Sequence, residues 1–155
     1  MDDARTVKEI LGGEEALGVH AMSAATISDL EHDGVPLAAA YALAERFQLG
    51  LSEILGIVGG LTSHPSTVLK EYWERQRRPG LAQKLGAVQS ANLVAGALTL
   101  AHAEQVFGSD REIAAWLRTP QPVLQGRRPV DLLGDADGRR TVDDVLTRIE
   151  HGVFA

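Results

Sequence analysis

The chain has 155 residues, a formal net charge of −6 at pH 7 and no cysteine. That length suits one domain or two small ones sharing a core, and the lack of cysteine excludes disulfides and cysteine-ligated zinc. The acidic total argues against indiscriminate nucleic-acid binding, but residues 61–90 hold 5 Lys or Arg against 2 Asp or Glu. This basic island permits a focused contact with phosphate.

The composition favours helices, since only 5% of residues are aromatic and no stretch alternates apolar and polar residues as a half-buried strand would. We therefore predict an all-α fold of about seven or eight helices. The start, MDDARTVKEI, has acids and no apolar core region, so no signal peptide is expected. The longest apolar run, residues 93–103, is too short for the roughly 20 residues that span a bilayer, so we expect a cytoplasmic protein without membrane contact.

The N-terminal part reads as short helices separated by glycine and proline. Helices are predicted over residues 7–11, 23–33, 36–50, 51–58 and 65–78. Ser23 and Ser52 are suitable N-cap residues, and Pro36 suits a first helical position. The proline-free stretch over residues 81–107 is apolar on nearly every face from Leu93 onward. Such a helix is normally buried, so we predict a central helix that bridges the two halves.

The last third of the chain carries dense helix start and stop signals. Ser109 with Glu112 forms a capping-box pattern, and the helix that it opens carries Trp116 on its apolar face. The prolines within residues 119–122 stop this helix, and Pro129 suits the start of a short one. A final helix has an apolar face made of Val142, Val145, Leu146 and Ile149.

These residues carry a resemblance to a known family. The shared pattern comprises Phe107-Gly108-Ser109, Trp116-Leu117, Thr119-Pro120, Gly126, Pro129, Asp131-Leu132-Leu133 and the segment from Arg148 to Phe154. In order and spacing it resembles the C-terminal toxin-binding domain of the Xre/MbcA/ParS antitoxins, which are partners of RES-domain toxins in type II toxin–antitoxin systems. The close resemblance covers about one third of the chain, and the upstream part fits the family more loosely.

The resemblance implies two regions. Residues 1–100 would form an N-terminal helical region with an Xre-like helix-turn-helix candidate at about 51–78, and residues 101–155 the toxin-binding domain. It implies an antitoxin that is not an enzyme, needs no cofactor and blocks the active site of a RES-domain toxin that consumes NAD. It also implies a homodimer within the toxin–antitoxin complex and repression of its own operon by binding operator DNA.

The predicted toxin contacts lie in one loop and in the tail of the chain. They are Arg127, Arg128, Arg148, Glu150, His151, Val153, Phe154 and Ala155. Phe154 is suited to an apolar pocket, while Glu150 and the terminal carboxylate could pair with basic groups that otherwise hold a pyrophosphate. The alternatives stay open: Phe154 folds back onto its own core or a second copy, and the arginines pair with nearby aspartates such as Asp131.

The helix-turn-helix candidate places residues 65–78 as the recognition helix. Its N-terminal residues would meet base edges, and its basic groups would meet phosphates. The predicted DNA contacts are Ser63, Ser66, Thr67, Lys70, Arg75, Arg77 and Arg78. Ser66 stands where the family tends to have an arginine, which is expected to weaken contact with bases. The alternative is an ordinary helical hairpin with a solvated basic end.

Nothing in the sequence points to catalysis. The five histidines show no metal-ligand spacing, and no phosphate-binding glycine loop or nucleophile motif occurs. We therefore predict no catalytic residue and no metal ligand. Two other functions stay open: a transcriptional regulator whose C-terminal domain only dimerises, and a structural module with neither toxin nor DNA as partner.

Overall fold

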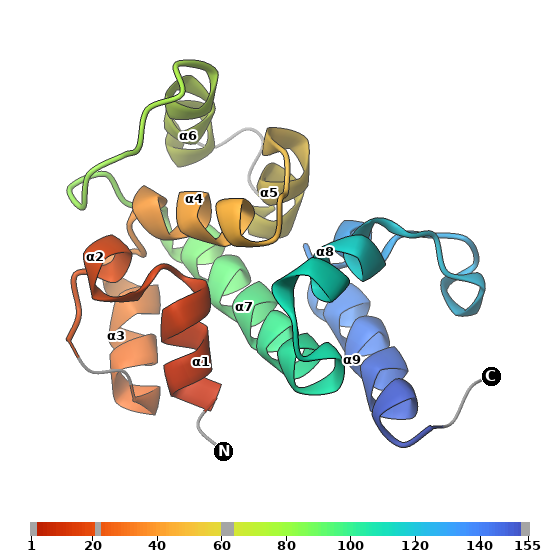
Figure 1. Ribbon diagram of the computed structural model, residues 1–155. Coiled ribbons are helices and arrows are strands. Elements are labelled where there is room, and N and C mark those ends of the chain that lie inside the picture. Colours follow the sequence, from red (N-terminus) through yellow and green to blue (C-terminus); the bar gives the residue numbers. More distant parts are fainter. Residues whose placement is uncertain (1–2, 21–22, 60–63, 153–155) are drawn as a thin grey trace.

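The computed structural model describes residues 3–20, 23–59 and 64–152, and it confirms the all-α class. Within these ranges there are nine α-helices and two short 3-10 helices, with two isolated β-bridges and no strand. Figure 1 shows a long helix, α7, crossing the middle of the molecule, with the N-terminal helices on one side of it and α8 and α9 on the other.

The helices follow each other with short connections. The N-terminal ones are α1 (Asp3–Ile10), α2 (Gly13–Leu17), α3 (Ala24–Asp33), α4 (Leu37–Arg46), α5 (Leu51–Val58) and α6 (His64–Glu74). The later ones are α7 (Ala87–Phe107), α8 (Asp110–Arg118), η1 (Pro122–Leu124), η2 (Pro129–Leu132) and α9 (Ala136–Glu150). The helix predicted over residues 7–11 corresponds to α1, which ends before Gly12 with its left-handed φ of +96°, whereas α2 was not predicted.

Most of the predicted caps are present. The hydroxyls of Ser23 and Ser109 each accept a backbone N–H from three residues further on, as predicted. The predicted N-cap of α5, Ser52, was wrong. Its cap is Gly50, whose N–H donates to the Glu53 carboxylate at 2.8 Å, so Ser52 lies inside the helix.

The start of α7 differs from the prediction, because the residues before it pair with the connection between α3 and α4. The Leu37 N–H donates to the Gln83 carbonyl at 2.9 Å, and the Leu85 N–H donates to the Val35 carbonyl at 2.8 Å. These bonds satisfy backbone N–H and carbonyl groups while the segment before α7 is extended. The segment would therefore gain no further backbone hydrogen bonds from becoming helical. The predicted start of the helix at Leu81 is therefore wrong.

The rest of α7 is the central helix, as predicted. It packs against α1, α3, α5, α8 and α9, which cover it on most sides. The fully or almost fully buried apolar residues of α7 are Leu93, Val94, Ala97, Leu100, Ala101 and Ala103. They belong to one continuous core to which both the N-terminal and the C-terminal helices contribute. The predicted boundary between the two regions, after residue 100, lies inside α7. No linker therefore separates the two regions at that position.

A close backbone contact joins α5 to the turn between η2 and α9. A Cβ atom added to Gly134 would lie 2.4 Å from the carbonyl oxygen of Gly56, which is closer than real Cβ contacts. Just beyond, the Asn92 side chain of α7 donates to the carbonyl of Val58 at 3.0 Å and holds the end of α5. Only glycine therefore fits at residue 134 while α5 keeps this position.

We predict that Gly134→Ala destabilises the fold by about 1–3 kcal/mol, because the added methyl group pushes α5 away from the C-terminal region. Gly56→Ala is the matched control. A Cβ atom on Gly56 meets nothing within 4 Å, and alanine is favoured over glycine inside a helix by roughly 0.5–1 kcal/mol. Urea denaturation of both variants measures the difference, and equal stabilities would show that the contact is not tight.

Candidate functional site

The loop between α8 and η2 (residues 119–128, the α8–η2 loop) is closed by its own hydrogen bonds. The Gln121 N–H donates to the Arg127 carbonyl at 3.1 Å, and the Gly126 N–H donates to the Gln121 carbonyl at 2.9 Å. Gly126 has a φ of +80°, a left-handed conformation that glycine adopts without steric cost. Figure 1 shows the loop extending away from the helices beside α9. It is an exposed turn with a defined shape.

Arg128 leaves this loop toward the protein and not toward solvent. Its Nε and Nη2 atoms donate to the two carboxylate oxygens of Asp131, each at 2.9 Å, and its Nη1 atom donates to Glu53 at 3.2 Å. The hydrogen bonds to Asp131 raise the pKa of Arg128 above its ordinary value, and the negative charge of Glu53 raises it further. The Asp131 pairing is the intramolecular alternative to a toxin contact.

Glu53 connects the N-terminal helices to the loop. Besides Arg128 and the Gly50 N–H, its carboxylate lies 3.6 Å from Nη2 of Arg118 at the end of α8. The Glu53 side chain is only 13% exposed, so these charges meet in a partly dry environment. One carboxylate of α5 thus fixes both ends of the α8–η2 loop.

Two other predicted toxin contacts remain exposed. The Nε atom of Arg127 donates to the Leu124 carbonyl at 3.1 Å within the loop, and the residue as a whole is exposed. Arg148 is exposed on α9, and none of the described residues forms an ion pair or hydrogen bond with its guanidinium. Both cations are available to a binding partner.

The end of α9 carries the next predicted contacts. Glu150 lies 3.9 Å from Nε2 of His102, whose Nδ1 atom lies 3.2 Å from Asp143, so this histidine joins α7 to α9. His151 is exposed, and its backbone N–H closes the helix on Thr147 at 3.1 Å. The predicted contacts that lie outside the described residues are Val153, Phe154 and Ala155.

The predicted DNA contacts lie on α6 and after it. Lys70 lies 4.0 Å from Glu74 on the same helix, and Arg75 is exposed. Arg77 packs over the ring of Tyr72 at 5.6 Å from its centroid. Ser66 and Thr67 belong to α6, but their side chains are not among those described, and Ser63 lies outside the described residues.

Arg78 is the most constrained of this basic group. It pairs with the Glu45 carboxylate at 2.6 Å and lies over the ring of Tyr41 at 5.8 Å from its centroid. The Tyr41 ring in turn packs against Trp73 of α6, with 5.0 Å between their centroids. Arg78 therefore helps to hold the segment after α6 against α4.

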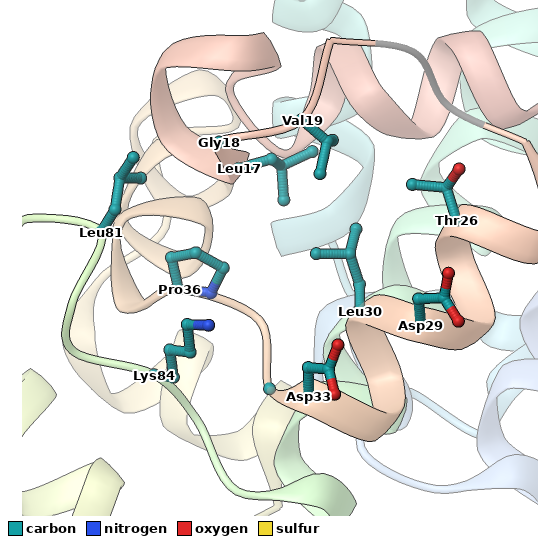
Figure 2. A pocket seen from close by; sticks show the side chains of 11 residues that line it. Leu17, Gly18, Val19, Thr26, Asp29, Leu30, Asp33, Pro36, Leu81 and Lys84 are labelled. Atoms are coloured by element: carbon teal, nitrogen blue, oxygen red, sulfur yellow. The ribbon is translucent and has the colours of Figure 1, made fainter.

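A pocket of about 390 Å³ lies between α2, α3 and the segment before α7. Figure 2 shows Asp29 and Asp33 reaching it from α3, Lys84 from the opposite wall, and Leu17 and Leu30 in its apolar part. The Thr26 hydroxyl on its lining lies 3.1 Å from Ser23 Oγ, and the described residues form no hydrogen bond between it and Asp29, Asp33 or Lys84 that would activate it as a nucleophile. We assign it no chemistry.

Within the described ranges, no three His, Asp or Glu side chains gather as metal ligands would. No helix in this part of the chain is long and apolar enough to cross a membrane.

Several residues that organise this surface were not predicted from the sequence. Glu53 stands three residues after Gly50, a spacing that signals a helix cap, but nothing in the sequence indicates its pairing with Arg128, which is far away along the chain. His102 and Asp143 likewise meet only because α7 and α9 pack together. Such contacts follow from the tertiary structure, so no local pattern could have indicated them.

Comparison with known proteins gives two findings for the C-terminal region. Residues 102–152 match the family described as the antitoxin Xre/MbcA/ParS C-terminal toxin-binding domain. A protein of Sphingobium sp. (strain YBL2), named Prs ADP-ribosylating antitoxin, is 39% identical over 49 residues. That match covers 32% of this chain and 31% of the relative, so the aligned part is about a third of each protein.

These findings confirm the predicted resemblance to Xre/MbcA/ParS-type antitoxins. The matched segment contains the end of α7, α8, the α8–η2 loop, η2 and the whole of α9. Its description is that of a binding domain, which supports the prediction that the chain is not an enzyme.

We predict that Glu53→Gln lowers the free energy of unfolding by about 1–2 kcal/mol, because the amide keeps the Gly50 cap but loses the charged hydrogen bonds to the arginines. Asp137→Asn is the control: its side chain is 96% exposed, 4.0 Å from Arg140, and we expect a change within about 0.5 kcal/mol. Chemical denaturation measures both. Equal losses would mean that Glu53 behaves as an ordinary surface charge.

Proposed function

We propose that this chain is an antitoxin whose C-terminal domain, residues 101–155, binds a RES-domain toxin and blocks the active site with which the toxin consumes NAD. The observation that carries the proposal is the match of residues 102–152 to a toxin-binding domain. The exposure of Arg127, Arg148, Glu150 and His151 supports it, since these are side chains that a partner can reach.

The name of the Sphingobium relative supports a partner of this chemical type. That name combines an antitoxin with ADP-ribosylation. ADP-ribose groups are transferred from NAD, so a toxin with this activity has a pocket for a pyrophosphate, two riboses and two rings. An antitoxin that occupies such a pocket excludes NAD by competition.

The end of α9 and the residues after it are suited to such a pocket. Among the described residues, the Glu150 carboxylate has only a long contact with His102, 3.9 Å, so it is suited to pair with cations that otherwise hold the pyrophosphate. Phe154 provides an aromatic ring for the space of the nicotinamide or adenine. In this proposal Val153 and Ala155 flank that ring, and Arg148 and His151 contact the rim of the pocket.

We further propose that α5 and α6 form a helix-turn-helix through which a homodimer represses its own operon. Lys70, Arg75, Arg77 and Arg78 are all exposed, and Arg77 and Arg78 also lie over tyrosine rings, so Lys70 and Arg75 are the freer candidates for phosphate contacts. The second candidate is a transcriptional regulator whose C-terminal domain only dimerises. It would bind the same DNA but would not protect cells from a toxin.

Deletion of residues 152–155 is expected to weaken inhibition of the toxin by at least about 30-fold, because aromatic residues at hot spots contribute 2 kcal/mol or more to binding. The measurement is growth rescue and cellular NAD level during co-expression with the toxin encoded beside this chain. The thermal unfolding midpoint of the shortened protein should stay unchanged, since the deletion starts beyond α9. Full inhibition by the shortened protein would rule out the tail as the blocking element.

Arg75→Ala should weaken binding to a DNA fragment from the upstream promoter and reduce the salt slope of the affinity by about one, as expected for one lost phosphate contact. Arg140→Ala, on the exposed side of α9, is the matched control and should leave the slope unchanged. Fluorescence anisotropy at several salt concentrations measures both. Identical slopes for Arg75→Ala and the parent protein would remove α6 from the proposed DNA interface.

A further inference from the structure

The tip of the α8–η2 loop is apolar and faces solvent. Pro120, Pro122 and Val123 are all exposed, and the Val123 side chain keeps 41% of its surface accessible. The loop carries no acidic residue between Arg118 and Arg128. An apolar tip therefore stands beside positive charge.

Val123 differs from the other exposed large apolar residues by its position in the chain. Those described are Leu81, Val88, Leu98 and Val123. The first three precede the segment that matches the toxin-binding domain, and Val123 lies inside it. Val123 also stands with the exposed Pro120 and Pro122, and an apolar patch inside the matched domain indicates a contact with a partner better than a single exposed side chain does.

The loop holds Val123 in one position before any partner arrives. The Leu124 N–H donates to the Gln121 carbonyl at 3.0 Å, and the Gln125 N–H donates to the Pro122 carbonyl at 3.0 Å. Leu124 itself is buried and ties the loop to the core. Because the tip is ordered by the protein's own bonds, binding through it costs little conformational entropy.

The charge around the tip indicates what surrounds its binding site on the partner. Arg118 and Arg128 pair with two carboxylates, Glu53 and Asp131. The excess positive charge therefore rests on Arg127, which is exposed at the base of the loop. A complementary surface has an apolar depression with a carboxylate at its edge.

We propose that Val123 at the tip of the α8–η2 loop is an apolar anchor that inserts into such a depression on the toxin, with Arg127 pairing with the carboxylate at its rim. This contact is separate from the tail after α9 and rests on the proposed antitoxin function. It gives the domain a second attachment to its partner, made by a preformed loop.

The test compares Val123→Asp with Val88→Asp, an equally apolar and even more exposed position on α7, 67% accessible and outside the matched domain. The probe is the purified toxin encoded beside this chain, and the measurement is the dissociation constant by calorimetry. Val123→Asp should weaken binding at least tenfold, whereas Val88→Asp should bind as the parent protein does. Val123→Ile, which keeps the apolar tip, should bind within about threefold of the parent protein.

The outcomes separate this inference from the function on which it rests. Parent protein and Val123→Asp binding with equal affinity would overturn the anchor while leaving the antitoxin proposal in place. No binding by the parent protein itself would overturn both. Equal weakening by both aspartate variants would also reject the anchor, because the effect would then come from added negative charge and not from loss of the apolar tip.

Discussion

The fold depends on the need of α7 to be covered on nearly every side. A helix whose apolar residues point in all directions is stable in water only when other helices surround it. Five helices provide that cover, three from the N-terminal region and two from the C-terminal region. The two regions therefore share one core, and the surface proposed to meet a toxin and the helix pair proposed to meet DNA rest on the same buried helix.

Partly buried charges fix how the outer helices lie on this core. Arg46 of α4 donates to Glu104 of α7 at 3.0 Å and to Asp110 of α8 at 3.1 Å. Glu53 of α5 pairs with Arg118 at the other end of α8 and with Arg128 at the end of the α8–η2 loop. Pairs of this kind lose less to solvent screening than exposed ones, and they require particular orientations of the helices. The shape of the loop is thus set by residues far from it in sequence.

Local chemistry made much of this fold predictable. The hydroxyls of Ser23 and Ser109 act as their positions suggested, because helix caps involve only neighbouring residues. The start of α7 was not predictable, since it depends on hydrogen bonds to Val35 and Leu37 from a distant connection. The same holds for the site: Arg128 was predicted as a toxin contact with pairing to Asp131 as the alternative, but its partner Glu53 was not predicted.

The contact between Gly56 and Gly134 has a mechanical consequence. The two backbones touch with no side chain between them, and the neighbours of both glycines carry bulky groups: Leu55 and Ile57 on one side, Leu133 on the other. Sliding α5 along the turn would drive those groups into a space without room for them, whereas a small tilt about the point of contact would not. The joint thus resists translation of α5 along the turn, while Asn92 and Glu53 hold the orientation of the helix.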